Sequence, residues 1–202
     1  MTELWVATTN NGKLNEFKSL LSDKGINLHS AAEIKVYSSP PETGTTFVDN
    51  ARIKARTLKS MKPGVWVVAD DSGLEVEGLG NMPGVHSARY AGPKAADAEN
   101  NAKVLKMLQI RSPLNRKARF VCVFVVFDPE GKEYVLDGTI EGNISDKSIG
   151  QAGFGYDFIF MPAGETKTFG ELGLAFKNRI SHRGQAIRKL AELILRPTSA
   201  SE

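Results

Sequence analysis

The sequence predicts an α/β fold, with a mixed central sheet and helices on both faces of that sheet. In the first half of the chain, apolar runs typical of strands alternate with patterns typical of amphipathic helices, which favours this class. In the second half, two strand patterns flank a turn at residues 128–131, which predicts a hairpin. A chain of 202 residues can bury one substantial core. We therefore expect one domain over residues 1–197 and a flexible tail at residues 198–202.

Local patterns place the elements of the first half. We expect a strand over residues 3–8 and then a helix over residues 12–24, after which Gly25 stops the helix. A loop rich in serine and proline leads to a second helix over residues 46–60. The apolar run over residues 65–69 predicts a buried strand, and Gly73 predicts the turn that closes it.

The second half adds paired strands to this arrangement. We expect a helix over residues 96–109, strands over residues 119–127, 133–141 and 156–160, and a last helix over residues 181–196. Pro197 closes that last helix. The hairpin strands make the predicted sheet a mixed one.

Composition and charge exclude several classes of protein. The hydrophobic fraction of 41% and the charged fraction of 24% are those of a globular protein. The net charge of +3 is spread along the chain, without the basic stripe of a stable nucleic-acid binder. No signal peptide opens the chain, and the longest apolar run, residues 120–127, is too short to cross a bilayer. The lone Cys122 indicates a core thiol in a reducing compartment, so we expect a cytoplasmic protein without a membrane partner.

Two adjacent carboxylates, Asp70 and Asp71, directly follow the predicted central strand, with Ser72 after them. Open α/β sheets bind their ligands at the carboxyl ends of strands. Since successive side chains point to opposite faces, at most one of the two acids aims straight into such a site. Acids at this position are typical of a divalent cation site, and a cation suggests phosphate. The alternative is a cap or Asx-turn that only closes the strand.

A polar turn separates the first strand from the first helix. It consists of Thr8, Thr9, Asn10, Asn11, Gly12 and Lys13. Free backbone N–H groups and the helix dipole favour phosphate at such a position, and Lys13 adds a cation. The spacing is not that of a Walker A loop. A simple N-cap by Asn10 or Asn11 explains the turn equally well.

Two further segments could hold a nucleotide. His182 and Arg183 follow the probable N-cap Ser181, where the helix dipole disfavours cations unless an anion or a carbonyl-rich ligand is near. A solvated first turn is the alternative. Phe154 and Tyr156 alternate with glycines before Asp157 and could stack on a base, although a turn entering the core is commoner.

A metal site could form between two segments. Asn50 and Lys54 share one face of the second predicted helix, and Glu42 lies just upstream. Glu42 together with Asp71 would suit Mg²⁺, which takes few protein carboxylates beside water and phosphate oxygens. Surface solvation is the alternative. The histidines and the single cysteine lack the spacing of a zinc site.

Taken in order, these segments resemble the inosine triphosphate pyrophosphatase family, the Ham1/RdgB-like nucleotidases. The matching segments are residues 8–13, 42–44 with 50–51, 69–74, 83–84 with 87–90, 153–157 and 180–184. They span nearly the whole chain. Thr9, Phe158 and the pair Ala175-Phe176 depart from the usual pattern of that family.

The resemblance implies an elongated fold of two lobes with the site in the cleft, and a homodimer. It also implies Mg²⁺-dependent hydrolysis of deaminated purine nucleoside triphosphates (ITP, dITP, XTP) to the monophosphate and pyrophosphate. Asp71 would be the general base and a metal ligand, with Glu42 as the other ligand. The residues implied to bind substrate are Thr8, Thr9, Asn10, Asn11, Gly12, Lys13, Ser72, Phe154, Gly155, Tyr156, Asp157, Lys177, His182 and Arg183.

Physical reasoning favours the same chemistry. Mg²⁺ with Lys13, Lys54, Lys177 or Arg183 could offset the charge of a triphosphate. Hypoxanthine and xanthine carry an acceptor at position 6 where adenine carries a donor, so donors from His182 or Arg183 would favour them. Two alternatives are a nucleotide pyrophosphatase of other base specificity and a nucleotide- or RNA-binding module without turnover.

Overall fold

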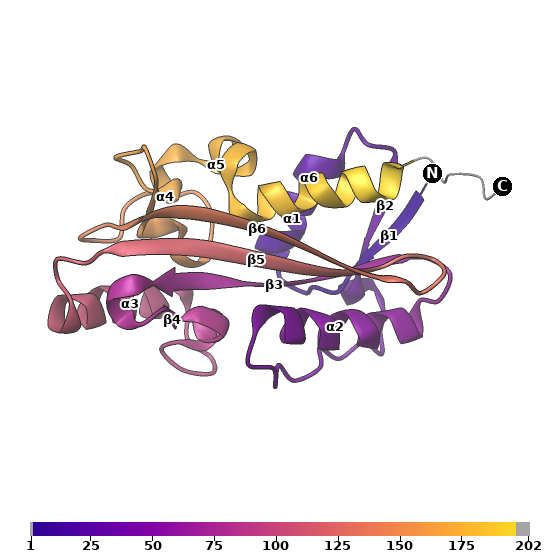
Figure 1. The fold of residues 1–202 in the computed structure, drawn as a ribbon, viewed down its shortest axis with the longest axis horizontal. Coiled ribbons are helices and arrows are strands. Elements are labelled where there is room, and N and C mark those ends of the chain that lie inside the picture. The colour runs from indigo at the N-terminus through magenta and orange to yellow at the C-terminus, as the bar shows by residue number, and fades with distance from the viewer. Residues whose placement is uncertain (1, 197–202) are drawn as a thin grey trace.

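The computed structural model describes residues 2–196, so Pro197 and the expected tail at residues 198–202 lie outside the described residues. Within them the chain forms a seven-stranded mixed sheet in the order β2-β1-β3-β5-β6-β7, with β4 paired to β3. The strands β3 (Trp66–Val76), β5 (Lys117–Phe127) and β6 (Glu133–Ile144) run along the length of the elongated molecule (Figure 1). The predicted α/β fold with a mixed sheet is confirmed.

The amino-terminal part supplies parallel strands. β1 (Thr2–Val6) pairs in parallel with β2 (Ile26–Ser30) and with β3, and α1 (Asn11–Leu21) connects β1 to β2. β2 was not predicted, because its five residues hold only two apolar side chains and no buried run. The next helix, α2 (Phe47–Met61), agrees closely with the helix predicted at residues 46–60.

The central strand is longer than the sequence pattern indicates. β3 continues through the supposed turn at Gly73 to Val76 and pairs with β5 in antiparallel register over this whole stretch. Gly73 is needed for close approach, because a Cβ atom there would lie 2.4 Å from the carbonyl oxygen of Gly84. Asp70 and Asp71 therefore lie in mid-strand, and the prediction of a strand end at this point was wrong.

One edge of β3 nevertheless remains open beside these acids. β1 pairs with β3 only as far as Val68, and β4 (Met82–Pro83) pairs with it only from Glu75 onward. Between these two points no described strand covers that edge. This gap lies beside the amino end of α1, where the polar turn of the first half arrives.

The second half builds the other end of the molecule. Its remaining elements are α3 (Asp97–Arg111), β7 (Phe160–Pro162), α4 (Phe169–Leu172), α5 (Leu174–Ile180) and α6 (His182–Leu195). The predicted strand over residues 156–160 was wrong, because Gly155–Phe158 forms a 3₁₀ turn that starts at a left-handed glycine with φ of 60°. The short helices α4 and α5 were not predicted.

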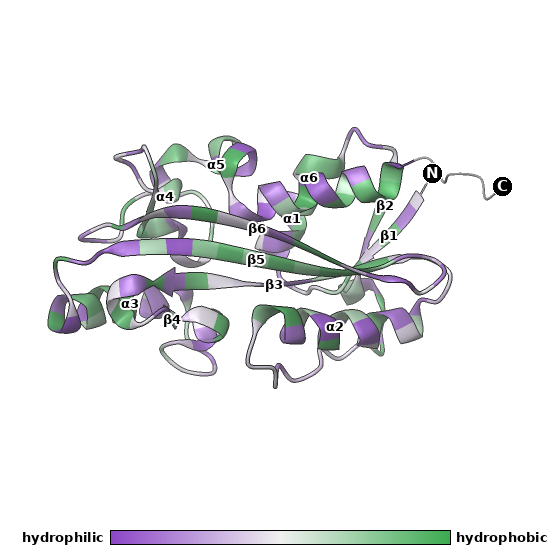
Figure 2. Ribbon diagram, viewed as in Figure 1, coloured by the Kyte–Doolittle hydropathy of each residue, from purple (hydrophilic) through white to green (hydrophobic). Residues whose placement is uncertain are grey.

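Helices cover both faces of the sheet, as predicted. α1 and α6 pack on one face and α2 on the other, whereas α3 and α4 lie at the far end (Figure 1). Three buried apolar clusters form the core. The cluster under α1 and α6 includes Phe124, the cluster under α2 includes Val67, and the cluster at the far end includes Phe160. The ribbon of β5, which lies in the middle of the sheet, is coloured as hydrophobic over most of its length (Figure 2). The two ends form two lobes that share the long strands.

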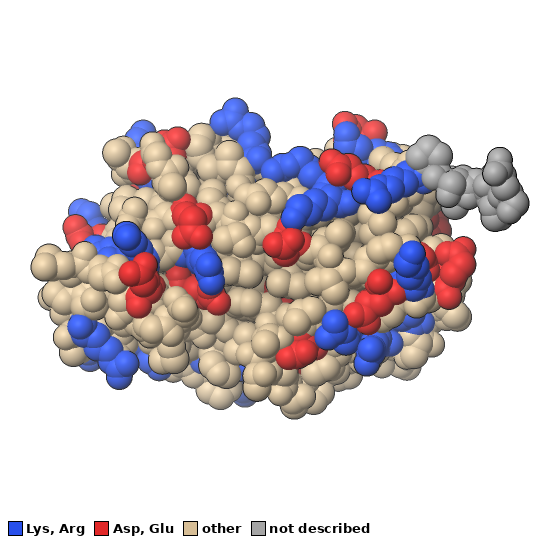
Figure 3. Space-filling model, in the orientation of Figure 1, with Lys and Arg blue, Asp and Glu red and all other residues tan. Residues whose placement is uncertain are grey.

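The surface carries both signs of charge. On the face seen in Figure 3, lysine and arginine side chains are interspersed with aspartate and glutamate. In the part of the chain that the structure describes, no helix has the length and apolar character needed to span a bilayer.

Candidate active site

The polar turn before α1 caps that helix. Asn10 is the N-cap, because its Oδ1 atom accepts a hydrogen bond from the backbone N–H of Lys13 at 3.0 Å. The hydroxyl oxygen of Thr8 in turn accepts from the N–H of Asn10 at 3.1 Å. Thr9, Asn10 and Asn11 are exposed. The capped helix start thus presents its positive end to solvent at the open edge of β3.

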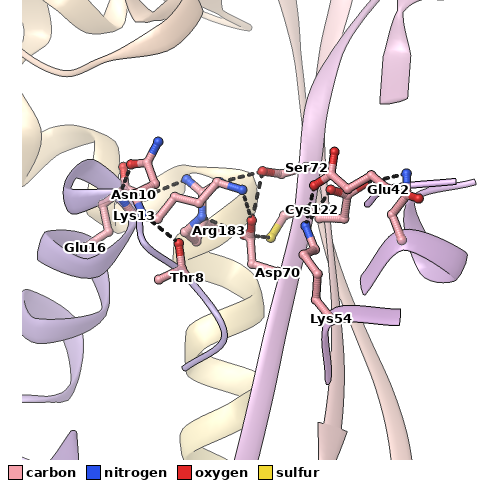
Figure 4. Close-up of polar contacts among 12 residues, drawn as sticks. Thr8, Asn10, Lys13, Glu16, Glu42, Lys54, Asp70, Ser72, Cys122 and Arg183 are labelled. Carbon is pink, nitrogen blue, oxygen red and sulfur yellow. Dashed lines mark hydrogen bonds and ion pairs between the residues drawn. The ribbon is translucent and has the colours of Figure 1, made fainter. Parts of the chain in front are cut away.

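A buried charge network lies on one face of β3 (Figure 4). Arg183 donates from Nε to Asp70 Oδ2 at 2.8 Å, and from Nη1 to Glu16 Oε2 at 2.6 Å. A third bond runs from Arg183 Nη2 to the hydroxyl oxygen of Ser72 at 2.6 Å. Lys13 forms an ion pair with Asp70. Burial alone would raise the pKa of the Asp70 carboxyl, but Arg183 and Lys13 hold that pKa well below its usual range.

Lys177 extends this network toward the second lobe. Its ammonium lies 2.8 Å from Glu16 Oε1 and 2.6 Å from Asp157 Oδ2. Asp157 Oδ2 also accepts the backbone N–H of Phe154 at 2.9 Å. Burial raises the pKa of Asp157, against the opposing charge of Lys177. The cations of α5 and α6 are thereby fixed to carboxylates from α1, β3 and the 3₁₀ turn.

Glu16 is a member of this network that the sequence analysis missed. It is 1% exposed and pairs with both Arg183 and Lys177. A signal was present: Glu16 lies three residues after Lys13 and beside Phe17, on the helix side that the apolar stripe marks as buried. A carboxylate on that side needs a cationic partner.

A pocket opens beside the network and gathers most of the residues predicted to bind substrate. Its lining includes the predicted Asn10, Lys13, Ser72, Phe154, Gly155, Tyr156, Asp157, Lys177, His182 and Arg183. Ser87, Asp97, Asn100 and Phe120 also line it and were not predicted. Thr8 and Thr9 lie in the adjacent turn before α1, and Asn11 and Gly12 are the first two residues of α1. Glu42, Lys54 and Asp71 lie elsewhere, on the other face of β3.

The ring of Phe154 forms one wall of the pocket. It packs so closely on α1 that a Cβ atom at Gly12 would lie 2.6 Å from the ring. The Lys177 ammonium lies 4.4 Å from the centre of the same ring. An aromatic wall of this kind, flanked by cations, suits a flat heterocycle.

His182 is a buried residue of the pocket lining. Its ring stacks on Phe120, with centroids 4.6 Å apart and an angle of 11° between the planes. Burial, with the nearby cations Arg183 and Lys177, lowers the pKa of His182 well below its usual value. Its Nδ1 atom is buried and has no hydrogen-bond partner among the described residues.

A second cluster lies on the opposite face of β3. The ammonium of Lys54 is 2.8 Å from Asp71 Oδ1 and 2.9 Å from Glu42 Oε1. Arg89 binds the other oxygen of Glu42 at 2.7 Å, and Asn50 approaches Asp71 Oδ2 at 3.4 Å. Burial raises the pKa of the Asp71 carboxyl, against the opposing charge of Lys54. Residues predicted from three separate motifs are therefore brought together here.

This cluster has two carboxylates that could hold a divalent cation. Both carboxylates reach the same ammonium, so their oxygens converge on a position that attracts a cation. Within residues 2–196 no group of three or more histidine, cysteine, aspartate or glutamate side chains forms a metal centre. Mg²⁺ commonly binds through one or two carboxylates and takes its other oxygens from water and phosphate. Glu42 and Asp71 are the residues that would hold it.

The family of this chain follows from comparison with known sequences. A sequence model of the Ham1 family matches residues 4–193, which is nearly all of the chain. The chain belongs to the Ham1 family. The resemblance seen in the sequence motifs is thereby confirmed.

Individual Ham1 relatives support the assignment. The chain is 50% identical over 191 residues to a dITP/XTP pyrophosphatase of Bdellovibrio bacteriovorus, with 94% of this chain and 96% of the relative covered. It is 42% identical over 194 residues to a dITP/XTP pyrophosphatase of Bacillus subtilis, with 96% and 98% covered.

Solved structures show the same fold. A HAM1 protein from Coxiella burnetii superimposes with a TM-score of 0.87 at 40% identity, covering 98% of this chain and 100% of that chain. A nucleoside-triphosphatase, or dITP/XTP pyrophosphatase, from Mycobacterium abscessus gives a TM-score of 0.72 at 42% identity, covering 94% and 97%.

Proposed function

We propose that this Ham1-family chain hydrolyses the deaminated purine nucleoside triphosphates dITP, XTP and ITP to the monophosphate and pyrophosphate with Mg²⁺. One observation carries the proposal: the aromatic pocket and the Asp71–Glu42–Lys54 cluster lie at the same open edge of β3. The enzyme class, a nucleoside triphosphate pyrophosphatase, is confirmed by the full-length relatives. The metal, the residue roles and the ranking of bases are our proposals.

The base would occupy the pocket against the ring of Phe154. Arg183 and the neutral His182 would offer donors to the oxygen at position 6 of hypoxanthine or xanthine. Adenine presents a donor at that position, so its binding would leave buried donors without partners. Asp70, Glu16 and Ser72 hold the guanidinium of Arg183 in place. Its remaining N–H groups would therefore donate to that oxygen from a fixed position.

The triphosphate would cross the open edge of β3 between the two clusters. The capped start of α1 offers backbone N–H groups and a positive dipole to the phosphates. Lys13 would exchange Asp70 for a phosphate oxygen, and Lys54 would offset charge near the other cluster. Cations on both faces of β3, Lys13 on one and Lys54 on the other, would thus contact one extended anionic substrate.

Asp71 would act as the general base in this arrangement. It would take a proton from a water molecule as that water forms a bond to the α-phosphorus, and the bond to the bridging oxygen of the β-phosphate would break. Pyrophosphate leaves with that oxygen. Mg²⁺ held by Glu42 and Asp71 would neutralise phosphate charge.

Parallel assays of released pyrophosphate and orthophosphate test the proposal. The substrates are dITP, XTP, ITP, GTP and ATP, each with Mg²⁺ and with excess chelator. Pyrophosphate from dITP, XTP and ITP alone, and only with Mg²⁺, is the expected result.

The other outcomes would change the assignment. Orthophosphate release would move the cleavage to another bond, and equal rates with ATP and GTP would indicate another base specificity. Binding without turnover would favour a nucleotide- or RNA-binding module. The homodimer and the cytoplasmic location stay predictions from the sequence.

A further inference from the structure

The amino end of α3 connects the two walls of the pocket. One wall is the 3₁₀ segment Gly84–Arg89, and the other is Phe154 with the turn Gly155–Phe158. Three side chains from the first turns of α3 contact these walls or the residues that follow them. We name Asp97, Asn100 and Asn101 the α3 clamp.

Asn101 and Asp97 hold both peptide groups of Gly155. Asn101 Nδ2 donates to the carbonyl oxygen of Gly155 at 2.9 Å, and to the carbonyl oxygen of Asp97 at 2.8 Å. Asp97 Oδ2 accepts the N–H of Gly155 at 2.6 Å. A glycine with both neighbouring peptide groups bound in this way cannot rotate without breaking a hydrogen bond.

Asn100 reaches the opposite wall. Its Oδ1 atom accepts the N–H of Ala91 at 2.8 Å, and its Nδ2 atom approaches the carbonyl oxygen of Ala88 at 3.4 Å. Asn100 and Asn101 are 3% and 2% exposed. Adjacent helix residues point about 100° apart, so two neighbouring asparagines can serve two different walls. Burying an amide is costly unless it is hydrogen-bonded. Asn100 is bonded at both amide atoms, and Asn101 is bonded at Nδ2, while its buried Oδ1 has no partner among the described residues.

Asp97 and Asn101 of the clamp restrain the backbone directly after Phe154. This residue lies between Gly153 and Gly155, whose φ angles of 92° and 60° are both in the left-handed region. Glycines restrict the backbone least, so they leave the position of the ring to other contacts. On one side Asp157 accepts the N–H of Phe154. On the other side Asp97 accepts the N–H of Gly155, Asn101 donates to the Gly155 carbonyl oxygen, and the N–H of Asp157 donates to the Phe154 carbonyl oxygen at 3.2 Å.

We propose that Asp97 and Asn101 are positioning residues that determine base specificity by fixing the Phe154 wall of the pocket. This inference rests on the proposed function. Without the clamp, Gly155 rotates and the wall moves away from His182 and Arg183. The base then binds more weakly and is distinguished less well. The side-chain hydrogen bonds of Asp97 and Asn101 go to Gly155 and within α3, so the Asp71–Glu42–Lys54 cluster keeps its geometry when either side chain is removed.

Steady-state kinetics with Asn101→Ala and Asp97→Ala test this inference. For each variant, kcat and KM are measured with dITP and dATP, together with inhibition by inorganic tripolyphosphate, which has no base. We expect KM for dITP to rise about fivefold to tenfold through loss of a hydrogen bond. The ratio of kcat/KM for dITP to that for dATP should fall. The value of kcat and the inhibition by tripolyphosphate should be unchanged.

Two further variants separate positioning from helix stability. Asp97→Asn retains an acceptor oxygen for Gly155 and should recover most of the wild-type KM. Glu99→Ala removes the acceptor of the Ala96 N–H, which donates to Glu99 Oε2 at 2.6 Å at the same end of α3. Glu99 contacts neither wall, so this variant should keep wild-type kinetics.

The possible failures are distinguishable. A wild-type protein without turnover of dITP overturns the proposed function and this inference with it. Normal wild-type turnover with unchanged KM and unchanged base preference in the variants overturns the clamp alone. Equal weakening of tripolyphosphate binding, or the same defect in Glu99→Ala, also overturns it. If Asn101→Ala does not fold, the kinetics of Asp97→Ala test the inference, because Asp97 is exposed and its loss should not prevent folding.

Discussion

Asp70 and Asp71 are neighbours in the chain, yet they belong to different ion clusters on opposite faces of β3. Asp70 contacts Arg183 at 2.8 Å beside the pocket, and Asp71 contacts Lys54 at 2.8 Å on the other face. The alternation of side chains along a strand causes this separation. Two chemically identical acids therefore have different environments, and their substitution should have different effects.

Asp71→Asn should abolish most turnover and leave the fold intact. The amide cannot accept the proton from water, and general-base catalysis typically contributes about 10²- to 10⁴-fold. Lys54 keeps Glu42 as a partner, so little stability should be lost. The measurement is kcat for pyrophosphate release together with the thermal unfolding midpoint. Turnover close to wild type would disprove the role of Asp71.

Asp70→Asn should instead weaken the fold. Asp70 is 2% exposed, and its loss of charge leaves the buried Arg183 with Glu16 as its remaining carboxylate. Breaking a buried ion pair on one side typically costs about 3–5 kcal/mol. Denaturant unfolding measures this loss. Asp146→Asn is the control, since it removes an exposed ion pair with Arg116 and should change stability little.

The same two acids show how far the sequence predicts this fold. The helices α2 and α3 and the hairpin of β5 and β6 follow from local patterns and are confirmed. The second half of β3 does not, because Asp-Asp-Ser-Gly has the local character of a turn. Its extension depends on pairing with β5, some fifty residues away along the chain. Such a long-range contact leaves no local pattern to read.

The site shows a similar limit. The motifs predicted much of the pocket lining and the acids of the second cluster, because turns and helix starts rich in polar residues are visible in a sequence. Glu16 and the clamp residues Asn100 and Asn101 lie inside helices, where polar side chains usually face solvent. Their burial is decided by tertiary contacts with α5, α6 and the Gly155–Phe158 turn.

Phe154→Ala should weaken nucleotide binding more than catalysis. Stacking of a base on an aromatic ring contributes enough that its loss should raise KM for dITP about tenfold or more. The chemistry at Asp71 is untouched, so kcat should change far less. Phe176→Ala is a matched control. Like Phe154, Phe176 has a cation over its ring, with the Arg179 guanidinium 5.1 Å from the ring centre, but it lies outside the pocket lining. Equal KM values for the two variants would contradict the stacking role.

Stability should depend on pH through His29. Its ring stacks on Trp5 and contacts Glu33 at 3.0 Å and Glu3 at 2.6 Å. The bond to Glu33, with that to Glu3, raises the pKa of His29 against the effect of partial burial. A raised pKa in the folded state means that this stabilisation is present below about pH 6.5 and is lost as pH rises through the folded pKa.

Thermal unfolding of wild type and His29→Gln across the range of about pH 6 to 9 checks the sign of this effect. The difference between the two midpoints should be largest at the acid end and should shrink as the pH rises. High salt should reduce it, because the cluster is partly exposed. A difference that grows with pH would contradict the assignment.

The rate at which the Cys122 thiol reacts with a disulfide reagent should measure how often the strands of the sheet separate. It is 0% exposed in β5, and its thiol donates to Asp70 Oδ2 at 3.2 Å. Burial, with the charge of Asp70, raises the pKa of this thiol well above its usual value, and the thiolate is the reactive form. β5 is paired on both sides, with β3 and with β6, so a reagent reaches Cys122 only after the strands separate. A disulfide reagent should therefore react slowly with the native protein, rapidly in denaturant, and faster with Asp70→Asn than with wild type. Rapid reaction of the native wild type would show that the centre of the sheet opens without global unfolding.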